Sequence, residues 1–170
     1  MPRRRGCRGR ARGLTLIELM VGVAVLALLA SLAVPATGHQ LARWKLQAAA
    51  EQLAADLAQA RWDAVERGRA QHLQLQDGEQ WCWSLSEAPG CGCDRPQACQ
   101  RQRVAAARYG GVTLETPARI SFAPTADARI AVASLALSSR SGERLRVLLS
   151  PLGRARVCAP DGPRMGYAAC

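Results

Sequence analysis

The hydrophobic pattern of the chain begins with a long apolar segment. Residues 14–34 are almost uniformly apolar and carry one charge, at Glu18. A helix of this length, at about 1.5 Å per residue, can cross a hydrocarbon core of about 30 Å, so we predict a membrane helix over 14–35. A carboxylate inside such a segment is costly without a partner, which makes Glu18 a functional candidate.

After Pro35 the pattern becomes amphipathic. Apolar residues recur every three or four positions along 46–64, which predicts that the helix continues over 36–69 with one face packed on a sheet. The charged residues of this segment, Asp56 and Asp63 among them, are expected mostly off the packed face.

From Gln71 the period changes to two, which predicts strands. Residues 71–76 and 79–85 flank an Asp77-Gly78 turn and predict a hairpin, whereas 87–108 has no usable period and is expected to be a long loop. Further short apolar runs with turn residues between them lie at 112–114, 119–123, 130–137, 145–149 and 154–158. We therefore predict an α+β fold in which the helix packs on an antiparallel sheet domain over 70–170.

The tryptophans allow two interpretations. Trp44 and Trp62 lie on the helix, and Trp81 and Trp83 share one face of the second hairpin strand, opposite Cys82. The first pair could form a binding surface and the second could stack on bases. Packing against the helix and the sheet is favoured for both pairs, because large aromatic side chains are usually buried.

The first thirteen residues carry much of the chain's net positive charge. They hold six arginines and no acid, which predicts a cytoplasmic leader and export of the rest of the chain. Without this leader the formal net charge falls from +10 to +4 and the cysteines from seven to six. An even number in an exported domain indicates disulfides rather than zinc, whose Cys-x-x-Cys pairs are missing. The six are Cys82, Cys91, Cys93, Cys99, Cys158 and Cys170.

Positive charge gathers at the C-terminal end. On a strand over 154–158, Arg154 and Arg156 project on one face about 7 Å apart, close to the spacing of phosphates along a nucleic-acid strand. Gly153 allows a sharp turn before them. Residues 140–170 carry a net charge of +4, and the further candidate DNA contacts in this segment are Arg144, Arg146 and Arg164. The alternative is a solvated edge strand on which charge prevents pairing. The basic segment 101–108 could extend the surface or be a solvated loop.

Catalytic chemistry is not indicated. His39 and His72 have no nucleophile or carboxylate constellation near them in the sequence, so we expect no enzyme, cofactor or metal site.

Residues 12–20, Arg-Gly-Leu-Thr-Leu-Ile-Glu-Leu-Met, resemble the signal of type IV prepilins and type II secretion pseudopilins. The resemblance implies that a prepilin peptidase cleaves between Gly13 and Leu14 and methylates the new amine of Leu14. It also implies that Glu18 pairs with the N-terminal amine of a neighbouring pilin subunit. Leu14 replaces the usual Phe of the family, which is a conservative change.

With Gly-Arg-x-Arg at 153–156, the whole chain resembles the GspH/FimT branch. FimT-type minor pilins bind extracellular DNA for natural transformation, which implies that role for Gly153, Arg154 and Arg156. The resemblance also implies a disulfide between Cys158 and Cys170, and a single-pass inner-membrane protein with a periplasmic C-terminal domain that enters a pilus or pseudopilus. The alternative is a GspH-type pseudopilin of a type II secretion system, or a pilus-priming minor pilin, with protein contacts only.

Overall fold

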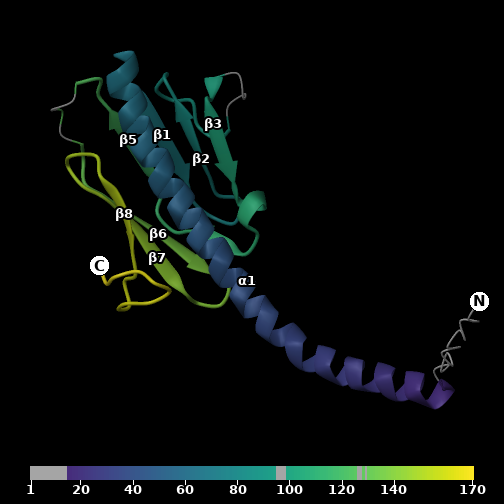
Figure 1. The fold of residues 1–170 in the computed structure, drawn as a ribbon. Coiled ribbons are helices and arrows are strands. Elements are labelled where there is room, and N and C mark those ends of the chain that lie inside the picture. Colours follow the sequence, from purple (N-terminus) through teal and green to yellow (C-terminus); the bar gives the residue numbers. More distant parts are fainter. Residues whose placement is uncertain (1–14, 95–98, 126–127, 129) are drawn as a thin grey trace, which may run out of the picture. The chain divides into compact units, whose positions relative to one another are not determined.

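The N-terminal part of the chain is helical. A computed structural model describes residues 15–94, 99–125, 128 and 130–170, without the side chains of 32–37 (Figure 1). Helix α1 covers Leu16–Arg67, close to the predicted bounds. The expected leader and cleavage site, including Gly13 and Leu14, lie outside the described residues. The chain divides into two units, 1–38 and 39–170.

In the first unit, Thr15 precedes the helix and its hydroxyl accepts a hydrogen bond from the Glu18 amide, 3.3 Å away. Thr15 and Glu18 thus have the spacing of a capping box, in which a Glu three residues after the cap lies near the positive end of the helix. The large apolar side chains from Leu16 to Leu29 are at least half exposed. Within the described residues, no helix is both long and apolar enough to span a membrane.

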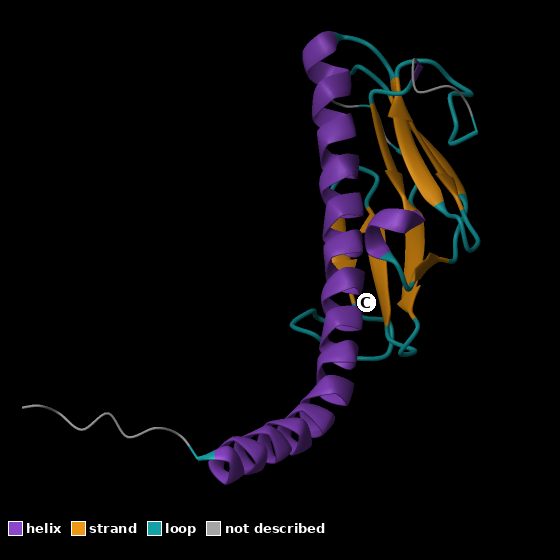
Figure 2. Ribbon diagram, turned by 90° about the vertical axis from the view of Figure 1, so that its right-hand side faces the viewer, coloured by secondary structure: helices purple, strands orange, loops and turns teal. Residues whose placement is uncertain are grey.

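The second unit places the C-terminal half of α1 along one side of two antiparallel sheets, each with four strands (Figures 1 and 2). The first sheet has the order β3-β2-β1-β5 and the second the order β4-β6-β7-β8. The strands of the first sheet are β1 (Gln71–Gln76), β2 (Cys82–Ser86), β3 (Gln102–Ala105) and β5 (Ala118–Phe122). Those of the second are β4 (Val112–Leu114), β6 (Ala133–Ser139), β7 (Arg144–Leu149) and β8 (Ala155–Cys158).

The core lies between this helix and the sheets. The helix residues predicted to pack inward, Leu46, Ala50, Leu53, Leu57, Ala60 and Ala64, are all fully buried. The sheets contribute alternate residues of their strands, such as Leu73 of β1 and Val147 of β7. Trp81 and Trp83 are buried and stacked, with ring centroids 5.2 Å apart, as expected of packing residues. The α+β class is confirmed, with the strands divided between two sheets.

Part of the predicted long loop is in fact ordered secondary structure. Strand β3 pairs with β2, with Val104 opposite Trp83, and the short 3₁₀ helix η2 (Ala106–Tyr109) follows it. Val104 is the one fully buried residue of this polar strand, so no alternating pattern marks it in the sequence. The strand expected over 130–137 also begins later, at Ala133.

One other expectation about the helix is wrong, and a second holds only in part. Trp44 and Trp62 do not pack, because 66% and 65% of their surface is exposed. Asp56 and Asp63 are only 4% exposed. Polar groups of the sheet domain meet these carboxylates: Trp83 Nε1 donates to Asp56 at 2.7 Å, and Arg101 lies 3.2 Å from Asp63. The helix therefore buries acids whose partners include residues distant in the chain, on strand β2 and just before strand β3.

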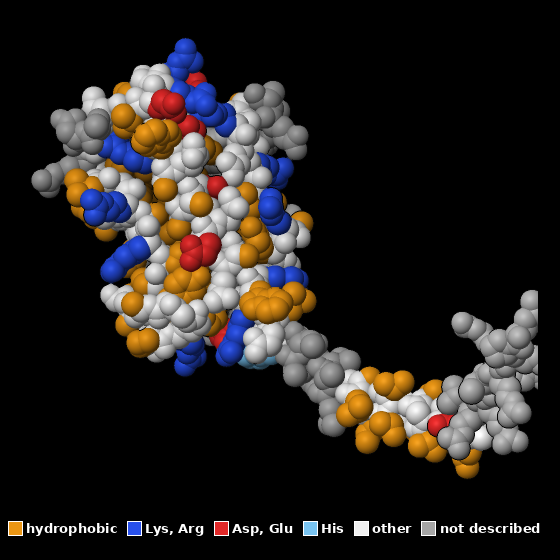
Figure 3. Space-filling view, viewed as in Figure 1, with side chains coloured by type: hydrophobic (Ala, Val, Ile, Leu, Met, Phe, Trp, Pro, Cys, Tyr) orange, Lys and Arg blue, Asp and Glu red, His pale blue; other side chains and the backbone are white. Residues whose placement is uncertain are grey.

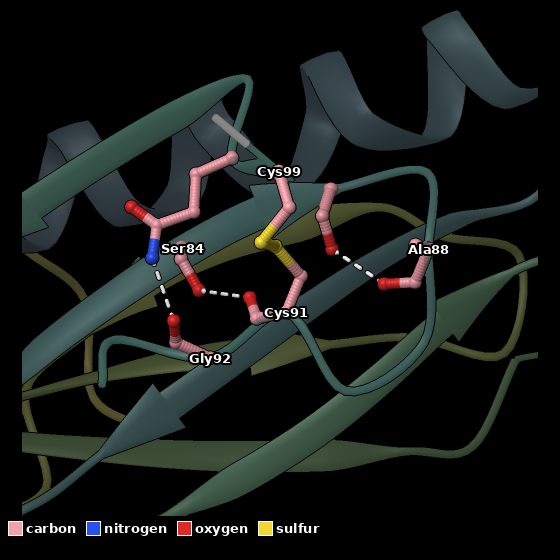
Figure 4. The surroundings of a disulfide bond; sticks show 7 residues. Ser84, Ala88, Cys91, Gly92 and Cys99 are labelled. Atoms are coloured by element: carbon pink, nitrogen blue, oxygen red, sulfur yellow. Dashed lines mark hydrogen bonds between the residues drawn. A yellow bond between two sulfur atoms is a disulfide. The ribbon is translucent and has the colours of Figure 1, made fainter. Parts of the chain in front are cut away.

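Of the three disulfides among the described residues, two hold a loop against the first sheet. The pairs are Cys82–Cys93, Cys91–Cys99 and Cys158–Cys170. The Ser84 hydroxyl on β2 donates to the Cys91 carbonyl at 3.0 Å, and Gln100 Nε2 donates to the Gly92 carbonyl at 2.6 Å (Figure 4). This loop buries Ser84 on the side of β2 away from the helix.

Candidate nucleic-acid interface

The second sheet brings four of the candidate arginines to its outer face. On β7, Leu145, Val147 and Leu149 are buried, so Arg144 and Arg146 point to the opposite, exposed side. Antiparallel pairing sets Arg146 opposite Cys158 and Leu148 opposite Arg156. Arg146 and Arg156 are therefore diagonal neighbours, a relation that corresponds to about 7–8 Å between backbones. Arg154, two residues before Arg156, is exposed and continues the same alternation.

The turn that precedes Arg154 depends on Gly153. Gly153 is buried with φ +78, and a Cβ on it would lie 2.9 Å from Ile130 Cδ1 and 3.1 Å from Arg61 Cγ. The Ser150 amide donates to the Arg154 carbonyl at 2.9 Å, and the Gly153 amide donates to the Ser150 carbonyl at 2.9 Å. The glycine thus lets the β7–β8 turn press against helix α1.

Arg61 of helix α1 packs against this turn, which the sequence did not predict. Its aliphatic carbons meet Gly153, and its guanidinium donates to the carbonyls of Ala123 and Thr125 at 3.2 and 3.1 Å. The separation of Arg61 from the turn along the chain leaves no local pattern that links them.

Replacing Gly153 by alanine is expected to destabilise residues 39–170 by about 1–3 kcal/mol. The cost combines a left-handed backbone for a residue with a Cβ and overlap with Ile130 and Arg61. Urea unfolding followed by tryptophan fluorescence measures it. Gly142→Ala is the matched control, because Gly142 has φ +81 and a Cβ there would meet nothing within 4 Å. Equal losses in the two variants would contradict a role for close contact at Gly153.

The C-terminal tail is tied to both the sheet and the helix. The Cys158–Cys170 disulfide closes it, and the backbones of Arg164 and Tyr167 exchange hydrogen bonds of 3.1 and 2.9 Å. The Tyr167 hydroxyl donates to Glu51 Oε1 at 2.8 Å, and Gln47 Nε2 donates to the Met165 carbonyl at 2.8 Å. Arg164 is therefore exposed on an ordered turn.

Alkaline titration tests how this tail is held. Burial of the phenol, together with the hydrogen bond to Glu51 and its negative charge, raises the pKa of Tyr167 from 10.0 to about 12. The proton is held more tightly in the folded state, so the stabilisation by this contact is complete below about pH 10 and is lost as the pH rises toward 12. Phenolate absorbance is expected to show a late-titrating group that Tyr167→Phe removes. Titration of Tyr167 near pH 10 would refute the contact.

The candidate arginines differ in their partners from other arginines of the domain. Among the described residues, the side chains of Arg144, Arg146, Arg154, Arg156 and Arg164 form no ion pair. By contrast, Arg101 lies within ion-pair distance of Asp63 and Glu87, and Arg43 pairs with buried Glu143.

The segment 101–108 does not join the arginines of the second sheet. Arg103 lies on β3 in the first sheet, and Arg108 lies over the Tyr109 ring at 5.9 Å from its centroid. Arg101 forms ion pairs within the domain.

Glu18 is exposed in the first unit, where the predicted pairing with another subunit's amine stays a prediction.

A long N-terminal helix whose second half covers antiparallel sheets defines the class of type IV pilin-like proteins. Residues 8–34 match the prokaryotic N-terminal methylation motif, which implies processing by a prepilin peptidase and assembly with other pilins. Residues 49–153 match the family described as type II transport protein GspH, and this match covers more than half of the chain. The chain therefore belongs to the GspH family of minor pilins and pseudopilins.

Solved structures show the same fold. The type IV minor pilin FimU of Pseudomonas aeruginosa, in one crystal form, is 20% identical with a TM-score of 0.54, over 74% of this chain and 97% of that chain. A second crystal form of FimU gives 20% identity and a TM-score of 0.52, over 72% of this chain and 100% of that chain. No curated protein sequence matches the chain significantly.

Proposed function

We propose that this protein is a minor type IV pilin that binds extracellular DNA without sequence preference during natural transformation. The observation that carries the proposal is the outer face of the second sheet, where Arg144, Arg146, Arg154 and Arg156 are exposed and, among the described residues, without an ion pair. Arg164 adds a fifth exposed cation on the tail, which the Cys158–Cys170 disulfide ties to the end of β8.

The chemistry of this surface suits phosphates more than bases. Guanidinium groups bind phosphate oxygens with paired hydrogen bonds, and contacts to the backbone carry no sequence information. The arginines extend from strands within a sheet, whose broad face does not enter a groove as a helix or a two-stranded ribbon does. Binding is therefore expected to depend on charge and to be indifferent to sequence.

Delivery to the filament completes the proposal. Cleavage between Gly13 and Leu14, methylation of Leu14 and pairing of Glu18 with a neighbouring amine would prepare and seat the subunit. Residues 14–35, part of which lies outside the described residues, would hold the precursor in the inner membrane with residues 70–170 in the periplasm.

Binding of residues 39–170 to labelled DNA of two unrelated sequences tests the function. This unit contains the whole described core. We expect similar affinity for both sequences and a steep loss with salt, with log K for duplex DNA falling by about 4 for each tenfold rise in salt if four or five phosphates are contacted. No complex at about 50 mM salt, or a strong preference for one sequence, would refute the proposal.

The second candidate is a pseudopilin that makes protein contacts only, which the GspH family match favours. Deletion of the gene separates the two candidates. Loss of DNA uptake with normal protein secretion supports the first, whereas loss of secretion of a folded substrate with normal DNA uptake supports the second.

A further inference from the structure

The sheet domain exposes large apolar side chains at one corner of the second sheet. Among the described residues after helix α1, only Val132 and Leu152 are large apolar residues with exposed surfaces, of 71% and 67%. Leu152 lies beside exposed Pro151 in the turn between β7 and β8. Val132 adjoins this turn, because it precedes the β6 residue that pairs with the last residue of β7. We call Val132, Pro151 and Leu152 the apolar corner.

Backbone hydrogen bonds fix the turn that carries Leu152. The turn is a three-residue hairpin loop, closed by the hydrogen bond from the Ser150 amide to the Arg154 carbonyl, with glycine in its left-handed position. Within the loop, Pro151 fixes its own φ, and its carbonyl accepts a hydrogen bond from the Ile130 amide at 2.9 Å. The loop is therefore held in a shape that directs Leu152 to solvent.

Cationic side chains lie beside the apolar corner. Arg154 follows the turn directly, is exposed and, among the described residues, forms no ion pair. Arg61 packs its aliphatic carbons against the glycine of the turn. In Figure 3, hydrophobic side chains lie next to Lys or Arg side chains where Figure 1, in the same view, draws this turn. A partner that fits the corner is therefore anionic on its outside and apolar within.

Duplex DNA has this chemistry, because its phosphates surround a stack of bases. An apolar side chain gains nothing from a phosphate, but it can enter the minor groove between two base pairs and partly unstack them, as apolar wedges do in proteins that bend DNA. The turn ends the edge strand pair β7–β8, so it lies where the broad face of the sheet stops. A corner can enter a groove that is closed to the face.

We propose that Leu152 inserts between base pairs of duplex DNA whose phosphates are held by the arginines of the second sheet. The inference rests on the proposed DNA binding and adds a contact that the arginines do not make. Arg154, two residues after Leu152, holds a phosphate beside the opened step. The contact depends on stacking and not on base edges, so binding stays indifferent to sequence. It favours DNA whose stacking is already weakened, because such a step costs less to open.

A lipid surface is the other anionic partner that accepts an apolar tip. The spacing of the arginines favours DNA. Arg154 and Arg156 lie about 7 Å apart along β8, close to the spacing of phosphates along a nucleic-acid strand, and Arg146 is the diagonal neighbour of Arg156. Lipid headgroups diffuse in the membrane and require no such fixed spacing.

Competition between two duplexes tests the proposal with residues 39–170, which contain the whole described core. The duplexes have the same length, and one carries a central thymine–thymine mismatch. We expect the wild type to bind the mismatched duplex about five- to tenfold more tightly, and Leu152→Ala to reduce this preference to less than about twofold. Because Leu152 is exposed, the variant should keep the wild-type midpoint of urea unfolding.

Leu41→Ala is the matched control, because it removes the same side chain from a half-exposed position on α1. Leu41 lies about 30 Å along the helix from Arg61, which contacts the turn. The control should keep the wild-type preference for the mismatched duplex.

A base analogue separates insertion from surface contact. The fluorescence of 2-aminopurine rises when the base unstacks, so in a fully paired duplex it should increase with the wild type and with Leu152→Met, but not with Leu152→Ala. Equal duplex preference and equal fluorescence in Leu152→Ala and the wild type would overturn insertion and leave phosphate binding by the arginines standing. Leu152-dependent binding to phosphatidylglycerol vesicles, with DNA binding that does not depend on Leu152, would also overturn it. No complex with either duplex at about 50 mM salt would refute both insertion and the proposed function.

Discussion

Arg154→Ala combined with Arg156→Ala is expected to weaken DNA binding by residues 39–170 about 10- to 100-fold at about 50 mM salt. Both side chains are exposed on one side of the sheet and, among the described residues, form no ion pair, so their charge is available to phosphates. Each phosphate contact releases counterions from the DNA. The loss of two contacts should therefore make the slope of log K against log[salt] shallower by about 2. Fluorescence anisotropy over a range of salt concentrations measures both quantities.

The matched control is Arg103→Ala with Arg119→Ala. It removes the same two charges from exposed positions on β3 and β5 of the first sheet. We expect this control to bind DNA within about threefold of the wild type, through its lower net charge alone. An equal loss in both double variants would show that DNA responds to overall charge rather than to the second sheet. Arg146→Ala alone should give an intermediate loss, because Arg146 is the diagonal neighbour of Arg156.

The elements with strong periodicity were predictable from the sequence. Residues spaced by three and four, from Leu46 to Ala64, required one buried helix face, and the structure buries that face completely. The hairpin around Asp77-Gly78 followed from alternation on both sides of a turn signal, and β1 pairs with β2 as expected, although β2 begins at Cys82 and not at the predicted Glu79. Strand β3 was not predicted, because only its Val104 is buried and no alternating pattern marks it. Its pairing with β2 depends on the tertiary structure.

The candidate site could be predicted only in part. Alternation along β8 placed Arg156 on a strand face, and the positive φ of Gly153 fits the predicted turn. The register of β7 against β8, which brings Arg146 beside Arg156, depends on pairing that the sequence does not specify. Contact of Gly153 with Arg61 depends on packing between elements far apart in the chain.

The helix shows why residue type alone is an uncertain guide to burial. Large aromatic residues are usually buried and acids usually exposed, yet here Trp62 is exposed and the adjacent Asp63 is buried. Successive helix positions point about 100° apart, so the rotation of the helix against the sheets decides which of the two faces inward. That rotation is set by Leu53, Leu57, Ala60 and Ala64, and it carries Asp56 and Asp63 toward polar partners on the first sheet and its loop.

Asp56→Ala is expected to destabilise residues 39–170 by about 2–4 kcal/mol. Three side chains donate hydrogen bonds to this buried carboxylate: Trp83 Nε1 at 2.7 Å, Gln52 Nε2 at 2.7 Å and Gln102 Nε2 at 2.8 Å. Alanine leaves these donors without their acceptor, and a buried unsatisfied donor costs about 1–3 kcal/mol. Asp56 also links α1 to both β2 and β3, so its loss should loosen β3 at the edge of the sheet. The midpoint of urea unfolding measures the change.

Two further variants separate the hydrogen bonds from the loss of charge and of helix contacts. Asp56→Asn keeps an acceptor oxygen for the indole and should lose less than alanine, and Glu66→Ala, an exposed acid on the same helix, should change stability by less than about 0.5 kcal/mol. A double-mutant cycle of Asp56→Ala with Trp83→Phe isolates the shortest contact to β2. Because the indole and the carboxylate are both buried, we expect a coupling of about 1 kcal/mol or more. Additive losses would mean that the carboxylate stabilises the domain through its glutamine partners, with little contribution from Trp83.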